Sequence, residues 1–194
     1  MKARTHDLAA ATGLSIAVVA LSPLPSLSLS TVLLAVVANQ LGGIAPDIDQ
    51  PTAPFWRNLP IGGFFGRIID KMLGGHRFIT HSLIGLALLT FLFHWLLVFL
   101  QPIMPGVTTG YVWWAFVIGM VSHLIMDTFT KEGVPWLLPI PVKFGFPPLK
   151  AFRITTGKSI ENFVVFPLLA LALFAIIAMH YGIFFDLLHK KITG

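Results

Sequence analysis

The sequence predicts an all-α protein that crosses a membrane several times as a single domain, residues 1–194. Only 11% of the 194 residues are charged and 56% are hydrophobic, whereas a soluble domain carries roughly 25% charged residues. Several apolar runs approach the roughly 20 residues that a helix needs to cross a bilayer. The 17 Phe and 5 Trp also exclude a disordered chain. Together these observations predict a polytopic helical membrane protein with about five membrane helices.

The N-terminal region contains two of the predicted helices. Residues 8–21 form a short apolar run and residues 27–45 form a longer one. Pro23 and Pro25 interrupt any helix between them, so the two runs are expected to be joined by a tight hairpin. A cleavable signal peptide remains an alternative, because residues 2–22 combine a basic start with an apolar stretch, although no small-x-small cleavage site stands out.

Three further spans follow along the chain. Residues 78–100 are the clearest, since they hold almost only aliphatic and aromatic side chains. Residues 111–129 form the next, with Trp113 and Trp114 placed where an aromatic belt lies at a membrane surface. Residues 163–185 are as long and as apolar as the first of these three.

Two segments between the spans are expected at the membrane surface. Residues 64–73 have the pattern of a short amphipathic helix lying in the interface. Its apolar face holds Phe64, Phe65, Ile68, Ile69 and Met72, with Arg67, Asp70 and Lys71 opposite. Residues 134–149 are apolar but contain five prolines, which exclude a regular helix. This segment is therefore expected to be a loop that is pressed against the membrane or covers a site.

The basic residues are distributed as expected for a protein whose N-terminus is cytoplasmic. Eleven of the 13 Lys and Arg residues fall in the N-terminus and in residues 46–77 and 131–160, which five spans place on one side of the membrane. The opposite loops, residues 22–30 and 101–110, contain none. The net charge of +5 therefore indicates contact with anionic lipid and not with nucleic acid.

Ionisable side chains from five predicted segments lie at this cytoplasmic face and predict a metal site there. His123 and Asp127 are four residues apart, so they share one face of a helix and can bind one ion. Asp47 and Asp49 lie between prolines in an extended segment, where both carboxylates can point to the same side. The candidate ligands are His6, Asp47, Asp49, His76, His81, His123 and Asp127.

The ligand types limit the choice of ion. The chain has no Cys, which excludes thiolate sites. Neutral imidazole together with carboxylate is a ligand set for a divalent metal, with zinc as the default and manganese or iron as alternatives. His76 is expected in a glycine-rich loop, and His81 in the first turn of the helix that follows.

Some His residues of the chain have expected or alternative roles other than metal binding. His94, His180 and His189 are interpreted as interface anchors or satisfied core residues. A proton relay or a structural ion pair remains an alternative for His123 and Asp127. An ionisable group inside a membrane span is costly, however, which favours a functional role for that pair.

With these motifs, the chain resembles the YdjM family of bacterial inner-membrane proteins, which are described as metal-dependent hydrolases. The motifs are Thr5-His6, Pro46-Asp47-Ile48-Asp49, Gly75-His76-Arg77 through Thr80-His81-Ser82, Ser122-His123 through Asp127, Thr130-Lys131-Glu132-Gly133-Val134-Pro135, Gly157 and Glu161. The resemblance implies a multi-pass protein of the bacterial inner membrane.

The YdjM family is in turn distantly similar to the zinc-dependent phospholipase C and P1 nuclease group, all-helical enzymes that hydrolyse phosphate diesters. An His-x-x-x-Asp helix supplies metal ligands in that group, and His123 with Asp127 resembles it. By the same likeness, His6, one of the two Asp and one of His76 or His81 complete the ligand set. A site for one or two ions is expected, because the chain has fewer His candidates than a three-zinc site needs.

The expected function is that of a membrane-bound metal-dependent hydrolase acting on a phosphate ester of a lipid or lipid-linked substrate. A bound divalent ion activates water, and whichever of Asp47 and Asp49 is not a ligand accepts the proton. Arg77 and Lys158 are candidates for stabilising negative charge, and Glu161, at the same face, is a further candidate catalytic residue. A metal or proton transporter and a non-catalytic scaffold with a structural metal remain alternatives.

Overall fold

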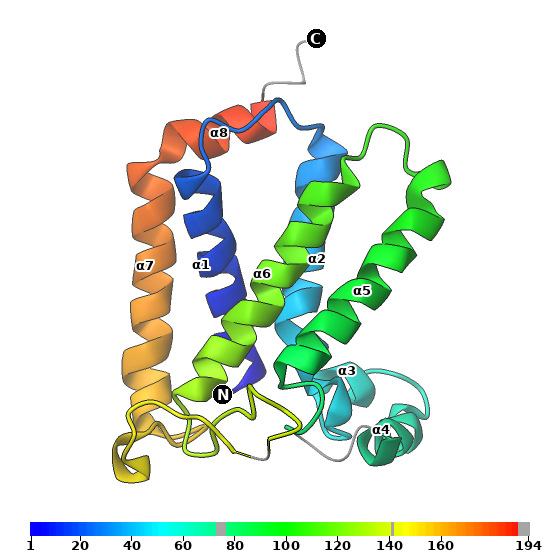
Figure 1. Cartoon of the computed structure of the whole chain (residues 1–194). Helices are drawn as coiled ribbons and strands as arrows, with labels where there is room; N and C mark the ends of the chain where they lie inside the picture. Colours follow the sequence, from blue (N-terminus) through cyan, green and yellow to red (C-terminus); the bar gives the residue numbers. More distant parts are fainter. Residues whose placement is uncertain (73–76, 141, 190–194) are drawn as a thin grey trace.

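The computed structural model describes residues 1–72, 77–140 and 142–189 (Figure 1). All regular secondary structure in these residues is helical. Five long helices stand side by side. They are α1 (Ala3–Ala20), α2 (Leu29–Ile44), α5 (Leu83–Leu100), α6 (Thr109–Thr128) and α7 (Phe166–Met179). The shorter elements are η1 (Ala45–Asp49), α3 (Pro54–Arg57), α4 (Gly62–Met72), η2 (Gln101–Ile103), η3 (Lys150–Phe152), the π-helix η4 (Glu161–Val165) and α8 (Tyr181–His189).

Four segments of the described chain are long and apolar enough to cross a membrane. They are Leu29–Asp49, Leu83–Ile103, Thr109–Thr128 and Glu161–Met179. Helix α1 is not among them, yet it packs against α2, α6 and α7 in the same bundle. The fold is therefore all-helical with four candidate membrane spans, and a role for α1 as a fifth span remains a prediction.

Two predicted helix boundaries were wrong. The apolar run 163–185 does not form one helix, because α7 ends at Met179 and His180 leaves the helical conformation with φ −117° and ψ 28°. Helix α8 then lies across the end of the bundle (Figure 1). Helix α5 begins only at Leu83, since Ser82 is its N-cap and accepts a hydrogen bond from the Gly85 N–H at 3.1 Å. His81 therefore precedes the helix and does not lie in its first turn.

Helices α2 and α6 make the closest contact in the bundle. A Cβ added at Gly119 would lie 2.1 Å from the Asn39 carbonyl oxygen, and one at Gly42 would lie 2.1 Å from that of Phe116. The two backbones thus touch directly, as small residues permit in membrane bundles. The Asn39 side chain also donates to the Ala115 carbonyl at 3.0 Å. This contact aligns α6 with the end of α2 and with η1.

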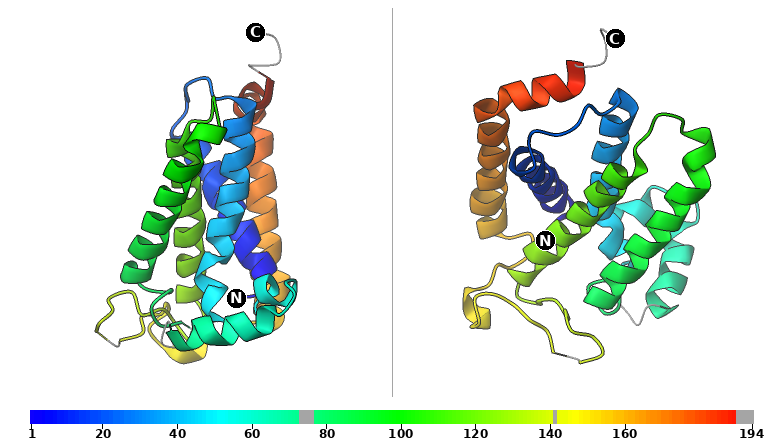
Figure 2. Two further views of the ribbon diagram at one scale, coloured as in Figure 1. Left: turned by 90° about the vertical axis from the view of Figure 1, so that its right-hand side faces the viewer. Right: turned by 45° about the horizontal axis from the view of Figure 1, so that its top comes forward.

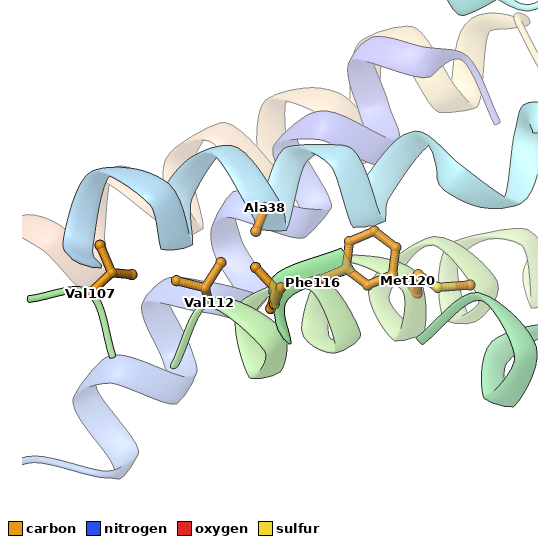
Figure 3. Packing of buried hydrophobic residues seen from close by; sticks show 6 residues of the cluster. Ala38, Val107, Val112, Phe116 and Met120 are labelled. Atoms are coloured by element: carbon orange, nitrogen blue, oxygen red, sulfur yellow. The ribbon is translucent and has the colours of Figure 1, made fainter. Parts of the chain in front are cut away.

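A small apolar core extends from this contact towards α5 (Figure 3). Its buried members are Ala38, Leu97, Val107, Val112, Phe116 and Met120. Phe93 of α5 stacks on Phe116 with ring centroids 4.1 Å apart. The core therefore joins the outer helix α5 to the pair formed by α2 and α6.

Gly119→Ala is expected to lower the free energy of unfolding by about 1–3 kcal/mol, the usual effect of overpacking. The added methyl group meets backbone atoms of α2, which cannot rotate away. Unfolding midpoints in detergent measure the effect. Gly110→Ala is the matched control on the same helix, because nothing lies within 4 Å of its Cβ position. A Gly119→Ala protein as stable as the control would contradict the close packing.

The predicted amphipathic helix is confirmed as α4, although Leu73 lies outside the described residues. Helix α4 lies across the end of the bundle that carries the N-terminus (Figure 2). Phe64 is 56% exposed and Met72 is 73% exposed. On its other side Gly66 packs against the ring of Trp56, whose Nε1 donates to the Ile48 carbonyl in η1 at 2.8 Å.

The proline-rich segment contains no regular helix in its described residues, as predicted. Val134 and Phe144 exchange two backbone hydrogen bonds of 2.8 Å, which close the segment into a loop. The Arg153 guanidinium donates to the carbonyls of Pro147 and Pro148 at 2.7 and 3.0 Å. The loop is therefore shaped by its own backbone and by one Arg.

Candidate metal centre

Imidazole and carboxylate side chains meet beside the N-terminus. Figure 1 shows the end of the bundle where the N-terminus lies. These side chains are His6 of α1, Asp47 of η1, His81 before α5, and His123 and Asp127 of α6. Four of them are at most 1% exposed, while the Asp47 side chain is 19% exposed. They form two overlapping groups that share His123, and within each group the ligand atoms lie within 4.8 Å of one another.

His123 is oriented by the neighbouring helix. Its Nδ1 lies 2.6 Å from the carbonyl oxygen of Gly43 in α2. Because a carbonyl only accepts hydrogen bonds, Nδ1 carries the proton and Nε2 presents a lone pair. This Nε2 faces Asp47 Oδ1 at 3.6 Å and Asp127 Oδ2 at 3.7 Å, and it has no hydrogen-bond partner among the described residues. The His123 Nε2 therefore faces one oxygen of each of two carboxylates.

Asp127 contacts all three imidazoles. His6 stacks on His123, with ring centroids 3.6 Å apart and an angle of 9° between the planes. The His6 Nε2 lies 3.3 Å from Asp127 Oδ1, and neither His6 ring nitrogen has a hydrogen-bond partner within the described part of the chain. The His81 Nε2 lies 3.6 Å from Asp127 Oδ2. Asp127 is therefore the centre of the cluster.

His81 is oriented from behind by Asp49 and Thr80. Its Nδ1 lies 3.0 Å from Thr80 Oγ1 and 3.6 Å from Asp49 Oδ2. Asp49 is fully buried, and the same Oδ2 accepts hydrogen bonds from the Thr80 hydroxyl and from the Arg77 N–H, the latter at 3.0 Å. The His81 Nε2 is thereby directed to the side where Asp47 and Asp127 lie.

Three carboxylates surround the imidazole of His81. Burial opposes the charged form of His81, but the neighbouring carboxylates of Asp127, Asp47 and Asp49 overcome it and raise the pKa of His81 to about 10. The carboxylates therefore favour a positive charge at this position, which a proton on His81 or a bound cation can supply.

Positive groups hold Asp127 in place. The buried Arg77 brings its Nη2 to 2.6 Å from Asp127 Oδ2, and its Nη1 donates to the Thr130 hydroxyl at 2.9 Å. That hydroxyl donates to the Asp127 carbonyl at 2.7 Å. The amino group of Met1 also contacts Asp127 Oδ1. Arg77 therefore binds a carboxylate of the cluster, and its role in stabilising negative charge on a substrate stays a prediction.

The donor set fits a divalent cation. Imidazole Nε2 atoms and carboxylate oxygens from four separate segments face one another. The buried His123 Nε2 has no hydrogen-bond partner within the described residues. The second ring nitrogen of His123 contacts a backbone carbonyl, and that of His81 contacts the Thr80 hydroxyl, which in turn donates to Asp49. Such contacts are the usual support of a metal-ligating His. One or two ions are compatible with the two overlapping groups.

The comparisons with known proteins agree with a membrane location. The model of the YdjM inner membrane protein family matches residues 1–185. The chain belongs to this family. It is also 26% identical over 130 residues to the uncharacterized protein YvsG of Bacillus subtilis (strain 168). The aligned region covers 66% of this chain and 69% of YvsG. No solved structure matches the chain.

Some predicted site residues of this YdjM family member lie apart from the cluster. The Glu161 carboxylate accepts hydrogen bonds from the Lys2 N–H, the Thr5 hydroxyl and the Gly157 N–H at 2.6, 2.8 and 2.6 Å, so it joins the start of α1 to η4. Lys158 is exposed. His76 lies outside the described residues.

The sequence analysis named Thr5, Thr80 and Thr130 only as parts of family motifs and gave them no role in the YdjM cluster. Thr80 directly precedes His81 and donates to the buried Asp49 carboxylate behind it. Thr5 directly precedes His6 and donates to Glu161, so it fixes the start of α1. Thr130 lies just beyond the end of α6 and donates to the Asp127 carbonyl. The contact of the Gly43 carbonyl with His123 could not be predicted from the sequence, because it depends on how α2 packs against α6.

Proposed function

We propose that this protein is a membrane-bound, metal-dependent hydrolase that acts on a phosphate ester of a lipid or lipid-linked substrate at the cytoplasmic face. One observation carries the proposal: imidazole and carboxylate atoms of His6, Asp47, His81, His123 and Asp127 face one another in a buried cluster at one end of the membrane helices. Sites that mix His and carboxylate ligands without thiolates commonly keep an open position for water.

The residues that would hold the ion are those five, with zinc as the first candidate and manganese or iron as alternatives. A divalent ion in such a site lowers the pKa of bound water and polarises a phosphoryl oxygen. Asp49 acts as a positioning residue, because its oxygen lies behind the His81 Nδ1. Arg77 likewise positions Asp127.

Asp47 has a second role in this proposal. It is the one carboxylate of the cluster whose side chain reaches the surface, at 19% exposure, while Asp49 and Asp127 are buried. A general base must be within hydrogen-bond reach of the water it deprotonates. Asp47 is therefore assigned the role of the general base that accepts the proton of the attacking water. Asp49 is not assigned this role, because it is buried.

A membrane-resident substrate suits the surroundings of the cluster. The exposed apolar side chains of α4 and the apolar loop 134–149 lie at the same end of the bundle (Figures 1 and 2). Such surfaces partition into the interfacial layer of a bilayer. A lipid can approach between them without leaving the membrane.

The distribution of buried charge favours an enzyme over a transporter. Among the described residues, the buried ionisable side chains are His6, Asp49, Arg77, His81, His123, Asp127 and Glu161, and all come from the segments at one end of the helices. A transport path needs such groups along the depth of the membrane. This arrangement supports a site at one face.

A hydrolysis screen tests the proposal. Purified protein supplied with zinc, manganese or iron is offered phospholipids and lipid-linked phosphates, and released phosphate or phosphorylated headgroup is measured. We expect turnover that a chelator abolishes and that the metal restores. If the ion stays bound and no member of the panel is hydrolysed, the structural-metal scaffold is the better interpretation.

The cytoplasmic placement is tested by labelling in intact cells. The chain has no Cys, so Ser26→Cys and Ser159→Cys each introduce a single thiol at an exposed position. An impermeant thiol reagent should label the Ser26 variant and should reach the Ser159 variant only after lysis. The opposite pattern would place the cluster on the outer face.

A further inference from the structure

Two cationic side chains are held together where the start of α1 meets the start of the last span. The Arg4 Nη2 donates to Asn162 Oδ1 at 2.7 Å, and the Lys2 Nζ donates to the same oxygen at 3.3 Å. Asn162 is itself fixed, because its Nδ2 donates to the Gly157 carbonyl at 3.0 Å. Arg4 lies over the ring of Phe166, 4.8 Å from its centroid. Both cations are therefore exposed side chains that contact one common acceptor.

The acceptor that holds these cations carries no charge. Both are bonded to one amide oxygen, so their nitrogens lie within about 6 Å of each other and repel. The nearby Glu161 carboxylate accepts three hydrogen bonds, none of them from the Arg4 or Lys2 side chain. Arg4 retains guanidinium donors without a hydrogen-bond partner among the described residues, and a planar fork of this kind matches phosphate oxygens.

The surroundings of the pair are those of a membrane interface. Ile160 and Phe163, which lie two residues before and one residue after Asn162, are 54% and 78% exposed. Exposed apolar side chains next to exposed cations are typical of a surface that meets the headgroups of anionic lipids. The pair is also close to the cluster along the chain, because Arg4 lies two residues before His6 on α1.

We propose that Lys2 and Arg4, held on Asn162, form a subsite for the phosphate of an anionic phospholipid headgroup beside the metal centre. The inference deepens the proposed function and rests on it only for the claim that the bound lipid is the substrate. The subsite explains why two cations share one neutral acceptor, and it places a headgroup phosphate next to the exposed apolar side chains at the start of the last span.

Lipid binding to the full chain tests the subsite. The dissociation constants of phosphatidylglycerol, phosphatidylcholine and inorganic phosphate are measured by native mass spectrometry of the detergent-purified protein. We expect phosphatidylglycerol to bind more tightly than the other two. The double variant Lys2→Gln/Arg4→Gln should weaken it roughly tenfold or more. The control Lys143→Gln/Lys150→Gln, two exposed cations in the proline-rich region, should leave it unchanged.

The variant Asn162→Asp tests the subsite without removing either cation. It keeps the shape of the side chain but supplies a carboxylate that neutralises the charge of Lys2 and Arg4. Phosphatidylglycerol binding should therefore weaken, while metal content stays at the wild-type level. Equal losses in the two double variants would overturn the subsite, because bulk charge would then explain the binding. Inorganic phosphate that binds as tightly as phosphatidylglycerol would overturn the assignment to a lipid.

This experiment is independent of hydrolysis. A protein that binds phosphatidylglycerol through Lys2 and Arg4 but hydrolyses nothing would disprove the proposed enzyme and leave the subsite standing. An active protein whose Lys2→Gln/Arg4→Gln variant binds the lipid as wild type does would disprove the subsite alone.

Discussion

Asp127→Asn is expected to remove most of the bound metal and to lower the free energy of unfolding by about 3–5 kcal/mol, the usual cost of leaving a buried charge without its partner. Asp127 contacts all three imidazoles and pairs with the buried Arg77. The Asn amide is neutral, and its NH₂ group cannot bind a cation or accept from Arg77. Metal analysis and an unfolding midpoint measure the two effects.

The control for Asp127→Asn is His189→Ala. His189 is exposed on α8, at the end of the bundle opposite to the cluster (Figure 1). This variant should keep the wild-type metal content and stability. Metal is measured on the folded, monodisperse fraction, so that loss of ligand is not confused with loss of fold. An Asp127→Asn protein that is folded and holds as much metal as the control would remove Asp127 from the ligand set.

Asp47→Asn is expected to lower the rate of hydrolysis by about 100- to 10,000-fold, the range that a positioned general base contributes. Its side chain is the partly exposed carboxylate of the cluster and lies 3.6 Å from the Nε2 atoms of His81 and His123. Rates at saturating metal, measured with the substrate found in the hydrolysis screen, isolate this effect from weaker metal binding.

Asp49→Asn is the matched comparison, because the two carboxylates are two residues apart in η1. Asp49 lies behind His81 and bonds to Thr80 and to the Arg77 backbone. Its loss should weaken metal affinity by about 10- to 100-fold, as for residues that support a ligand, with the rate restored by excess metal. Identical behaviour of the two variants would contradict the division of roles.

Much of the helical arrangement could be predicted from the sequence. Apolar runs bounded by prolines or polar residues predict membrane helices because the bilayer imposes their length. The amphipathic pattern of α4 was equally clear, since one face of a short helix held all its large apolar residues. The turn at His180 was not predictable, because the run 163–185 is apolar on both sides of it.

The membership of the cluster was partly predictable. The four-residue spacing of His123 and Asp127 needs only helix geometry, and the structure brings His6, Asp47 and His81 to the same pair. The segment of Asp47 and Asp49 was predicted to be extended, and this was wrong, because Ala45–Asp49 form a 3-10 helix, η1. Its turn gives the two carboxylates different positions. The pairing of Arg77 with Asp127 joins segments far apart in the chain, so no local pattern could indicate it.

The metal content of the wild-type protein tests the central claim most directly. Protein purified in detergent from cells supplied with zinc, manganese and iron should carry about one or two divalent ions per chain. His123→Ala should lose them, and His94→Ala, an exposed His on α5, should retain them. A folded wild-type protein without a divalent ion, or equal metal in the two variants, would contradict a metal centre formed by His6, Asp47, His81, His123 and Asp127.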